Sequence, residues 1–286
     1  MSKLAELNTF IDQMHSLSAM PATINKVLEL VNNPESSLKE ISRVIEKDFE
    51  LSSKVLKIVN SSYYGFKEKI SSIQMAVVAL GINTLRSMAT GISFLNAIGH
   101  ALEEVINLQK FWEHSMATAV IAGMAVKNIK PDFKEDIFVS GLLHDIGKVV
   151  LLQWVGRLYK KTEEKSKLEN KPLFMCEKEL IGVNHAEAGS LLAKKWHFPE
   201  EIIFTIEFHH QKDIFHLNRK EKKNIYANAV YFANQVALEK EIGQSGDFYR
   251  EILPDELLDY LRLKPFDVVE IFKTSDSYIR HLKKTI

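Results

Sequence analysis

The segment GLLHDIGKVV at residues 141–150 decides the fold, because it sets polar side chains among apolar ones. His144, Asp145 and Lys148 bring an imidazole, a carboxylate and an ammonium group together, and their apolar neighbours predict a buried helix. Adjacent residues leave a helix about 100° apart, so His144 and Asp145 can face one point, where the two glycines of the segment leave space. A buried carboxylate needs a metal ion or another charge as its partner. Taken alone, the segment favours a buried His–Asp pair that only hydrogen-bonds, and a metal centre is the alternative that depends on residues before and after it.

Composition narrows the class of protein. The 286 residues suffice for one large domain or two small ones, and 46% of them are hydrophobic. The 37 basic and 37 acidic residues balance, so nothing favours general binding to nucleic acid or to an anionic membrane. Cys176 is the only cysteine, which excludes an intramolecular disulfide and suits a reducing compartment. Without a signal peptide or an apolar run of ~20 residues, we expect a cytoplasmic protein with no membrane partner.

Hydrophobic periodicity predicts an all-α fold, since apolar residues recur at helical spacing and no segment alternates with period two. The predicted helices span residues 4–17, 22–31, 38–46, 51–60, 73–80, 84–98, 108–129, 137–154, 158–170, 173–180, 185–195, 200–210, 224–239, 253–263 and 266–282. The helix over residues 158–170 is rich in Lys and Glu and is expected to present a solvated face. We predict a helical bundle divided into an N-terminal helical lobe (1–100), a helical core (101–242) and a helical tail (243–286).

Polar residues at helices or helix ends of the second half form a candidate metal-ligand set: His114, His144, Asp145, His185, His209, His210 and Asn234. Imidazole nitrogens and a bridging carboxylate suit borderline divalent ions such as iron, manganese or zinc. We expect one or two ions. One would lie on His114, His144 and Asp145, and the other on Asp145, His185, His209 and His210. Any single histidine is better explained by ordinary packing, and it is the set of five histidines beside a His–Asp pair that favours a metal site.

The chain resembles the HD-related output domain, HDOD, and through it the HD and HD-GYP phosphohydrolases. The resemblance extends from about Leu17 to Asn234. In the first half it rests on Leu17, Pro21, Val44, Ile45, Asp48, Leu51, Lys54, Val55, Leu56, Asn60, Ser61, Tyr63, Tyr64, Gly65, Ile70, Ile73, Ala76, Leu80 and Gly81. In the second half it rests on His114, His144, Asp145, Gly147, Lys148, His185, His209 and His210.

The resemblance implies an all-helical fold, with an N-terminal lobe packed on an HD-type metal-binding core. It also implies an output or scaffold module in bacterial signalling, with a signalling protein as partner. Two departures from HD-GYP enzymes matter. Asn234 stands where the last family ligand is aspartate, and the residues after His210 lack the Gly-Tyr-Pro loop that helps to hold cyclic di-GMP. Many HDOD proteins have lost the histidines, whereas this chain keeps nearly all of them.

Two functions compete at this stage. In the first, the chain is a regulatory module with a structural or sensory metal, and residues 60–64 are a candidate partner surface or else a helix end and turn. In the second, it is a phosphohydrolase or phosphodiesterase acting on a nucleotide or another phosphoester. Two metals would then activate water, with Asp145 and Lys148 as the catalytic residues. Lys148 is otherwise a snorkelling lysine or a partner for Asp145. Oxygen chemistry at a di-iron pair is a third possibility.

Overall fold

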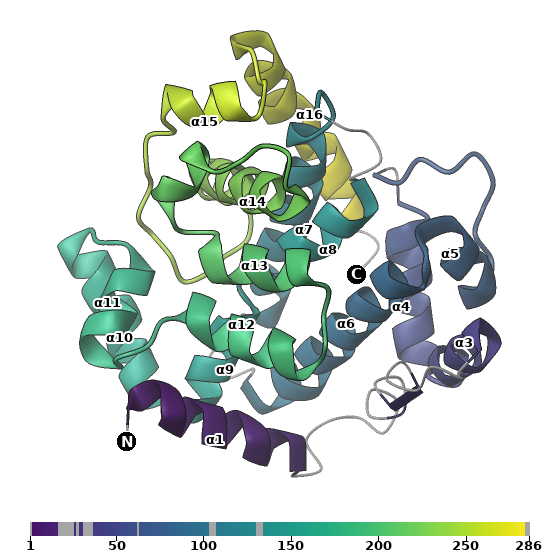
Figure 1. Cartoon of the computed structure of the whole chain (residues 1–286), viewed down its shortest axis with the longest axis horizontal. Coiled ribbons are helices and arrows are strands. Elements are labelled where there is room, and N and C mark those ends of the chain that lie inside the picture. The colour runs from purple at the N-terminus through teal and green to yellow at the C-terminus, as the bar shows by residue number, and fades with distance from the viewer. Residues whose placement is uncertain are drawn as a thin grey trace.

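The protein is all-helical throughout the part of the chain that the structure, a computed structural model, describes (Figure 1). The described residues are 2–16, 26, 29–30, 37–61, 63–102, 107–129 and 134–283. The predicted all-α class is therefore confirmed. The predicted helix over residues 22–31 lies mostly outside the described residues, as do Leu17 and Pro21.

Helices follow one another closely in the described parts of the chain. The first hundred residues contain α1 (Lys3–Ser16), α3 (Leu38–Glu46), α4 (Phe49–Val59), α5 (Ile73–Leu80) and α6 (Ile82–Leu102). The central part contains α7 (Leu108–Ala125), α8 (Lys134–Leu143), α9 (Ile146–Val155), α10 (Arg157–Glu169), α11 (Leu173–Leu180) and α12 (His185–Lys195). The last part contains α13 (Glu200–Phe208), the 3-10 helix η2 (Lys212–His216), α14 (Lys222–Glu239), α15 (Asp255–Tyr260) and α16 (Pro265–Lys283).

Local signals in the sequence set several of these boundaries. The Ser37 side chain accepts a hydrogen bond from the Glu40 backbone while the Glu40 carboxylate accepts one from Ser37, which starts α3 with a capping box. Asn184 and Glu187 start α12 in the same way. Both boxes satisfy amide groups that the first turn of a helix leaves open, so these two starts agree with the predicted ones.

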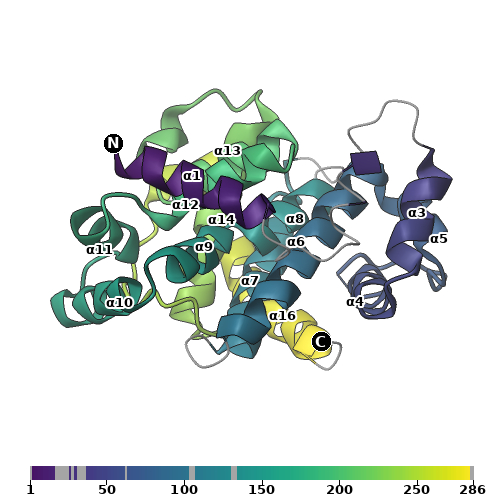
Figure 2. The ribbon, with the colours of Figure 1, turned by 90° about the horizontal axis from the view of Figure 1, so that it is seen from below.

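The helices α3, α4 and α5 lie to one side of the molecule, and α6 runs from them along α8 and α9 (Figures 1 and 2). The first helix lies elsewhere, because α1 packs against α9 and α12. One hydrophobic cluster extends continuously from Val55 of α4 to Val150 of α9 and Ile206 of α13. The two sides thus share a core, and the predicted division at residues 100 and 242 stays a prediction.

The helix α7 is central to the second half of the chain, because it packs between α8 and α14 and beside α16. Thirteen of the 18 residues of α7 are buried, as expected of a central helix that is covered along most of its surface. A second hydrophobic cluster joins α7 to the C-terminal helices through Tyr231, Leu257 and Ile271. The helices α15 and α16 therefore pack on the core through residues such as Leu257 and Ile271.

The predicted single helix over residues 137–154 is wrong, because the chain turns at His144 and Asp145 between α8 and α9. Asp145 has φ −96° and ψ 8°, and its side chain makes no capping bond to α9. Both flanking segments are apolar and buried, so periodicity alone could not reveal the break. The stretch Ile137–Val155 is also long and apolar enough to cross a membrane by composition, but 89% of it is buried inside the protein.

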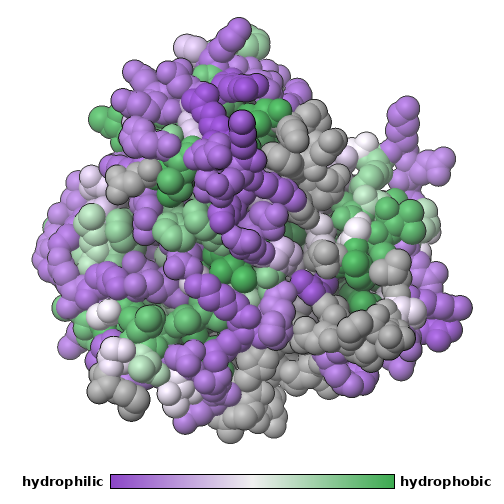
Figure 3. Space-filling view, viewed as in Figure 1, coloured by the Kyte–Doolittle hydropathy of each residue, from purple (hydrophilic) through white to green (hydrophobic). Residues whose placement is uncertain are grey.

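Exposed hydrophobic side chains occur on the α4–α5 side of the molecule. Phe49 at the start of α4 and Val78 on α5 are each 87% exposed. Figure 3 shows hydrophobic surface over this side of the molecule, whereas hydrophilic residues dominate much of the same face elsewhere.

The turn after α4 is a structural element. The Asn60 side chain donates to the Ile70 carbonyl at 2.7 Å and accepts from the Ile70 amide at 2.8 Å. Ser61, Tyr63 and Tyr64 are buried, so the candidate partner surface over residues 60–64 is wrong for these three residues. The turn interpretation fits instead, and Ser62 lies outside the described residues.

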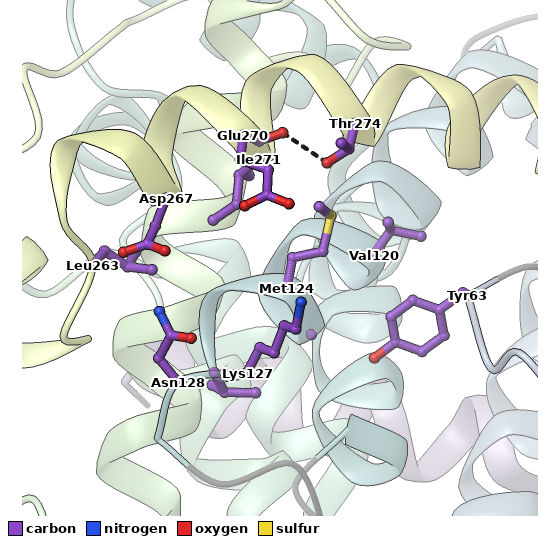
Figure 4. Close-up of a pocket in the computed structure, with 12 residues that line it drawn as sticks. Tyr63, Val120, Met124, Lys127, Asn128, Leu263, Asp267, Glu270, Ile271 and Thr274 are labelled. Atoms are coloured by element: carbon purple, nitrogen blue, oxygen red, sulfur yellow. Dashed lines mark hydrogen bonds between the residues drawn. The ribbon is translucent and has the colours of Figure 1, made fainter.

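Tyr63 joins this turn to the core. Its ring lies 4.7 Å from that of Phe138 on α8, and a Cβ atom at Gly123 of α7 would lie 2.0 Å from the Tyr63 hydroxyl. Beside Tyr63, a cavity of about 390 Å³ opens between α7 and α16, with Asp267 and Glu270 on its α16 wall (Figure 4).

Candidate metal centre

The predicted ligands come together from five parts of the chain. His114 lies on α7, His144 and Asp145 form the α8–α9 turn, and His185 is the first residue of α12. His209 and His210 follow α13, and Asn234 lies on α14. His210 is half-buried, and all the others are at most 1% exposed.

Two glycines allow this convergence. A Cβ atom at Gly147 would lie 1.9 Å from the His185 carbonyl oxygen, and one at Gly141 would lie 2.6 Å from Ala119 Cα. Only glycine permits backbones to approach so closely. The space that the two glycines leave beside the His–Asp pair is therefore filled by the backbones of neighbouring helices. Gly147 lets α9 pack against α12, and Gly141 lets α8 pack against α7.

The Asp145 carboxylate is the hub of the centre. Its Oδ1 faces His185 Nε2 at 3.3 Å and His209 Nε2 at 3.7 Å. Its Oδ2 faces His144 Nε2 at 3.3 Å and His114 Nε2 at 3.8 Å. Each oxygen therefore serves a separate pair of imidazoles.

Hydrogen bonds behind the rings fix the direction in which their nitrogens point. His144 Nδ1 bonds to the Gly141 carbonyl, and His209 Nδ1 bonds to the Ile206 carbonyl, each at 2.8 Å. A carbonyl only accepts, so each Nδ1 must carry the proton. In a neutral ring with this tautomer, Nε2 presents a lone pair to the centre, which is the arrangement that a metal ligand requires.

Several of the converging atoms have no hydrogen-bond partner although they are buried: Nε2 of His114, His144 and His209, Oδ1 of Asp145 and Oδ1 of Asn234. Buried polar atoms in folded proteins are nearly always satisfied. Two ligand sets, Asp145–His185–His209–His210 and His114–His144–Asp145, each keep their donor atoms within 4.8 Å of one another. This buried group could hold a metal, because neutral imidazoles and a carboxylate are suitable donors.

Protonation agrees with this chemistry. Burial lowers the pKa of His114, His185 and His209 to about 3, so their rings are neutral at pH 7. Burial alone would raise the pKa of Asp145, but the charges of His144 and Lys148 outweigh it and hold that pKa well below its usual range. Asp145 is therefore an anion, and the rings of His114, His185 and His209 beside it are neutral.

Lys148 is the partner of Asp145. Its Nζ donates to Asp145 Oδ2 at 2.7 Å, and the residue is only 2% exposed. A snorkelling lysine would carry its ammonium group to solvent. The interpretation of Lys148 as a counter-ion of Asp145 thus fits the structure.

Glu177 is a buried residue of the site that the sequence analysis missed. Its Oε2 accepts hydrogen bonds from the His185 backbone at 2.8 Å and from His185 Nδ1 at 2.7 Å. Burial raises the pKa of Glu177 to about 8. A signal was present, because Glu177 lies beside Leu173 and Cys176 on the buried side of α11.

The helix α10 is also less solvated than predicted. Tyr159, Thr162 and Ser166 form a buried face. Glu163 and Tyr159 line a cavity of about 190 Å³ that reaches Lys148. Burial raises the pKa of Glu163 to about 7, so the Lys and Glu content of α10 concealed a face that packs on the site.

A known protein family matches most of the chain. The model of the HDOD domain matches residues 17–212. The chain belongs to the HDOD family. This family is associated with signal transduction, as the resemblance in the sequence implied.

Two curated proteins are similar to this chain in sequence, and both are named as uncharacterized proteins. One, from Treponema pallidum (strain Nichols), is 27% identical over 255 residues, which cover 88% of this chain and 47% of that protein. The other, YuxH of Bacillus subtilis (strain 168), is 32% identical over 94 residues, which cover 32% of this chain and 23% of that protein. The chain thus spans about half the length of the first relative and less of the second.

Solved structures share the HDOD fold. An HDOD domain protein of unknown function from Geobacter sulfurreducens has a TM-score of 0.67 at 22% identity, with 99% of both chains covered. A candidate phosphohydrolase from Shewanella amazonensis SB2B has a TM-score of 0.67 at 24% identity, with 98% of this chain and 97% of that chain covered. At these identities the likeness shows the fold alone.

Proposed function

We propose that this HDOD protein is a regulatory module of bacterial signalling whose His/Asp centre binds at least one divalent metal ion. The burial of the centre carries the proposal. Asp145 and the three histidines His144, His185 and His209 have no exposed surface, so a phosphoester cannot reach an ion among them without movement of the helices. An enclosed site suits a structural or sensory metal, whereas a catalytic metal keeps an open position.

A metal there would be held by imidazole nitrogens and the Asp145 carboxylate, with Glu177 orienting His185 from behind. Such a set suits iron, manganese or zinc. When bound, the ion would offset the negative charge of Asp145 and satisfy the orphaned donor atoms. The ion would therefore stabilise the junction of the helices that converge on it.

A signalling partner is the proposed target of the module. A candidate signal transduction protein from Marinobacter aquaeolei VT8 has a TM-score of 0.66 and 20% identity, and the match covers 93% of this chain but 59% of that one. A similar fold within a longer protein supports a role beside other modules. Exposed Phe49 and Val78 offer apolar contacts for a partner on the α4–α5 side.

Phosphohydrolase activity is the second candidate. It is favoured by the cavity of about 190 Å³ beside Lys148, which would suit a small phosphoester. Two Shewanella amazonensis SB2B proteins of the same fold carry phosphohydrolase names, one of them metal-dependent. Against it, Glu163 lines this cavity and Lys148 is already paired with Asp145, so little positive charge remains for a phosphate.

Metal analysis followed by an ester assay tests the proposal. We expect purified protein to contain iron, manganese or zinc, His144→Ala to lose it, and the chromogenic diester bis-(p-nitrophenyl) phosphate to remain intact. Glu179→Gln, an exposed change on α11, serves as the control and should keep the metal. Protein that folds but takes up no divalent ion would refute the metal centre, and turnover that depends on His144 would favour the hydrolase.

A further inference from the structure

The two oxygens of the Asp145 carboxylate differ in their surroundings. Oδ1 has no hydrogen-bond partner and faces His185 and His209. His210 completes this side, since its Nε2 lies 2.8 Å from His185 Nε2. A buried anionic oxygen that meets only imidazoles calls for a cation.

The other oxygen already has a cation. Lys148 Nζ lies 2.7 Å from Asp145 Oδ2, and both side chains are buried. A divalent ion bound to the same oxygen would be close to this ammonium group, and two cations in a buried site repel each other strongly. An ion could bind Oδ2 only if Lys148 moved away.

The remaining donors on this side bring no negative charge. His114 and His144 are imidazoles, and Asn234 is a neutral amide. His114 Nε2, His144 Nε2 and Asn234 Oδ1 have no hydrogen-bond partner, but none of these donor atoms is anionic, so none supplies the negative charge that an ion competing with Lys148 would need.

Lys148 is also held in place by its wider surroundings. It lines the cavity of about 190 Å³ together with Tyr159 and Glu163 of α10, and it is only 2% exposed. Withdrawing the ammonium group from Oδ2 would leave a buried carboxylate without its cation.

We infer that the centre takes one divalent ion, on Asp145 Oδ1 with His185, His209 and His210, and that the Lys148 ammonium occupies the place of a second ion. This inference rests on the proposed metal binding and specifies its stoichiometry. The two predicted half-sites are then unequal. One binds metal, and in the other the Lys148 ammonium group compensates the charge of Asp145.

Manganese uptake tests the inference without relying on activity. The full chain would be stripped with chelator, incubated with excess Mn²⁺ and desalted. Metal would then be counted by mass spectrometry and its coupling examined by electron paramagnetic resonance. We expect one Mn²⁺ per chain with the spectrum of an isolated ion. The double variant Lys148→Met/Asn234→Asp, which removes the ammonium and adds a carboxylate, should take up two coupled ions.

Single variants keep the test decisive if the double variant does not fold. His209→Ala should lose the ion, whereas His114→Ala should retain one Mn²⁺ per chain, with circular dichroism checking that each is folded. Two coupled ions in the wild type, or loss of the ion in His114→Ala alone, would overturn the inference while leaving metal binding intact. No uptake by folded wild-type protein would instead overturn the proposed function.

Discussion

Glu177 gives the sharpest prediction about how the centre is built. One oxygen of this buried carboxyl group accepts two hydrogen bonds from His185, one from the backbone and one from Nδ1. In Glu177→Leu both donors stay buried without a partner. Each such donor costs about 1–3 kcal/mol, and relief of the buried acid offsets part of this, so we expect the free energy of unfolding to fall by about 2–5 kcal/mol.

The same change should weaken metal binding. Without its acceptor, the His185 ring can rotate or move its proton to Nε2, and the loss of such supporting bonds typically costs about 10–100-fold in metal affinity. Glu177→Gln is the informative partner. Burial holds the pKa of Glu177 at about 8, so the acid is mostly protonated at pH 7, and a neutral amide oxygen can accept the same two bonds. Glu177→Gln should therefore keep most of the stability and most of the metal affinity of the wild type.

Urea unfolding followed by circular dichroism would measure stability, and competition with a chelating dye would measure metal affinity. Glu179→Leu on the same helix is the matched control, since Glu179 is exposed and only pairs with surface lysines. It should change stability by no more than about 0.5 kcal/mol. The role assigned to Glu177 would be refuted if Glu177→Leu left the metal affinity unchanged. It would also be refuted if Glu177→Leu and Glu179→Leu lost equal amounts of stability and metal affinity.

Three further predictions concern packing and pH. Gly147→Ala would force a Cβ atom to within 1.9 Å of the His185 carbonyl oxygen. Thermal unfolding should show that the free energy of unfolding falls by about 3 kcal/mol, and the metal content should fall as well. A melting curve like that of the wild type would contradict the close packing. Asn60→Ala leaves both backbone groups of Ile70 without their partner, so urea unfolding should reveal a loss of about 2–3 kcal/mol, and a smaller loss would mean that water replaces the side chain. Burial lowers the pKa of His114, His185 and His209 to about 3, below the unfolded value of 6.5. The metal-free protein should therefore be most stable above pH 6.5 and lose stability as the pH falls toward 3. A free energy of unfolding that stays constant between pH 7 and 4, measured by urea unfolding with circular dichroism, would exclude these buried neutral rings.

Short-range patterns in the sequence were sufficient for much of the fold. Three helices have the predicted bounds, namely Ile73–Leu80, Leu173–Leu180 and His185–Lys195. The prediction succeeds there because caps and hydrophobic stripes act within one or two helical turns. The His–Asp break between α8 and α9 was missed because both neighbouring segments are apolar. The role of Glu177 was missed because its partner lies eight residues away across a turn.

The sequence by itself determined the helical class, the family and the chemical types available for a metal site, since these depend on periodicity and on residue identity. Only the tertiary structure decided that imidazoles from separate helices meet at Asp145, that Lys148 contacts one of its oxygens and that Asp145, His144, His185 and His209 are buried. The physical reason is that distance, burial and charge compensation arise between helices. They depend on close backbone contacts, such as that of Gly147 with His185, between segments far apart in the chain.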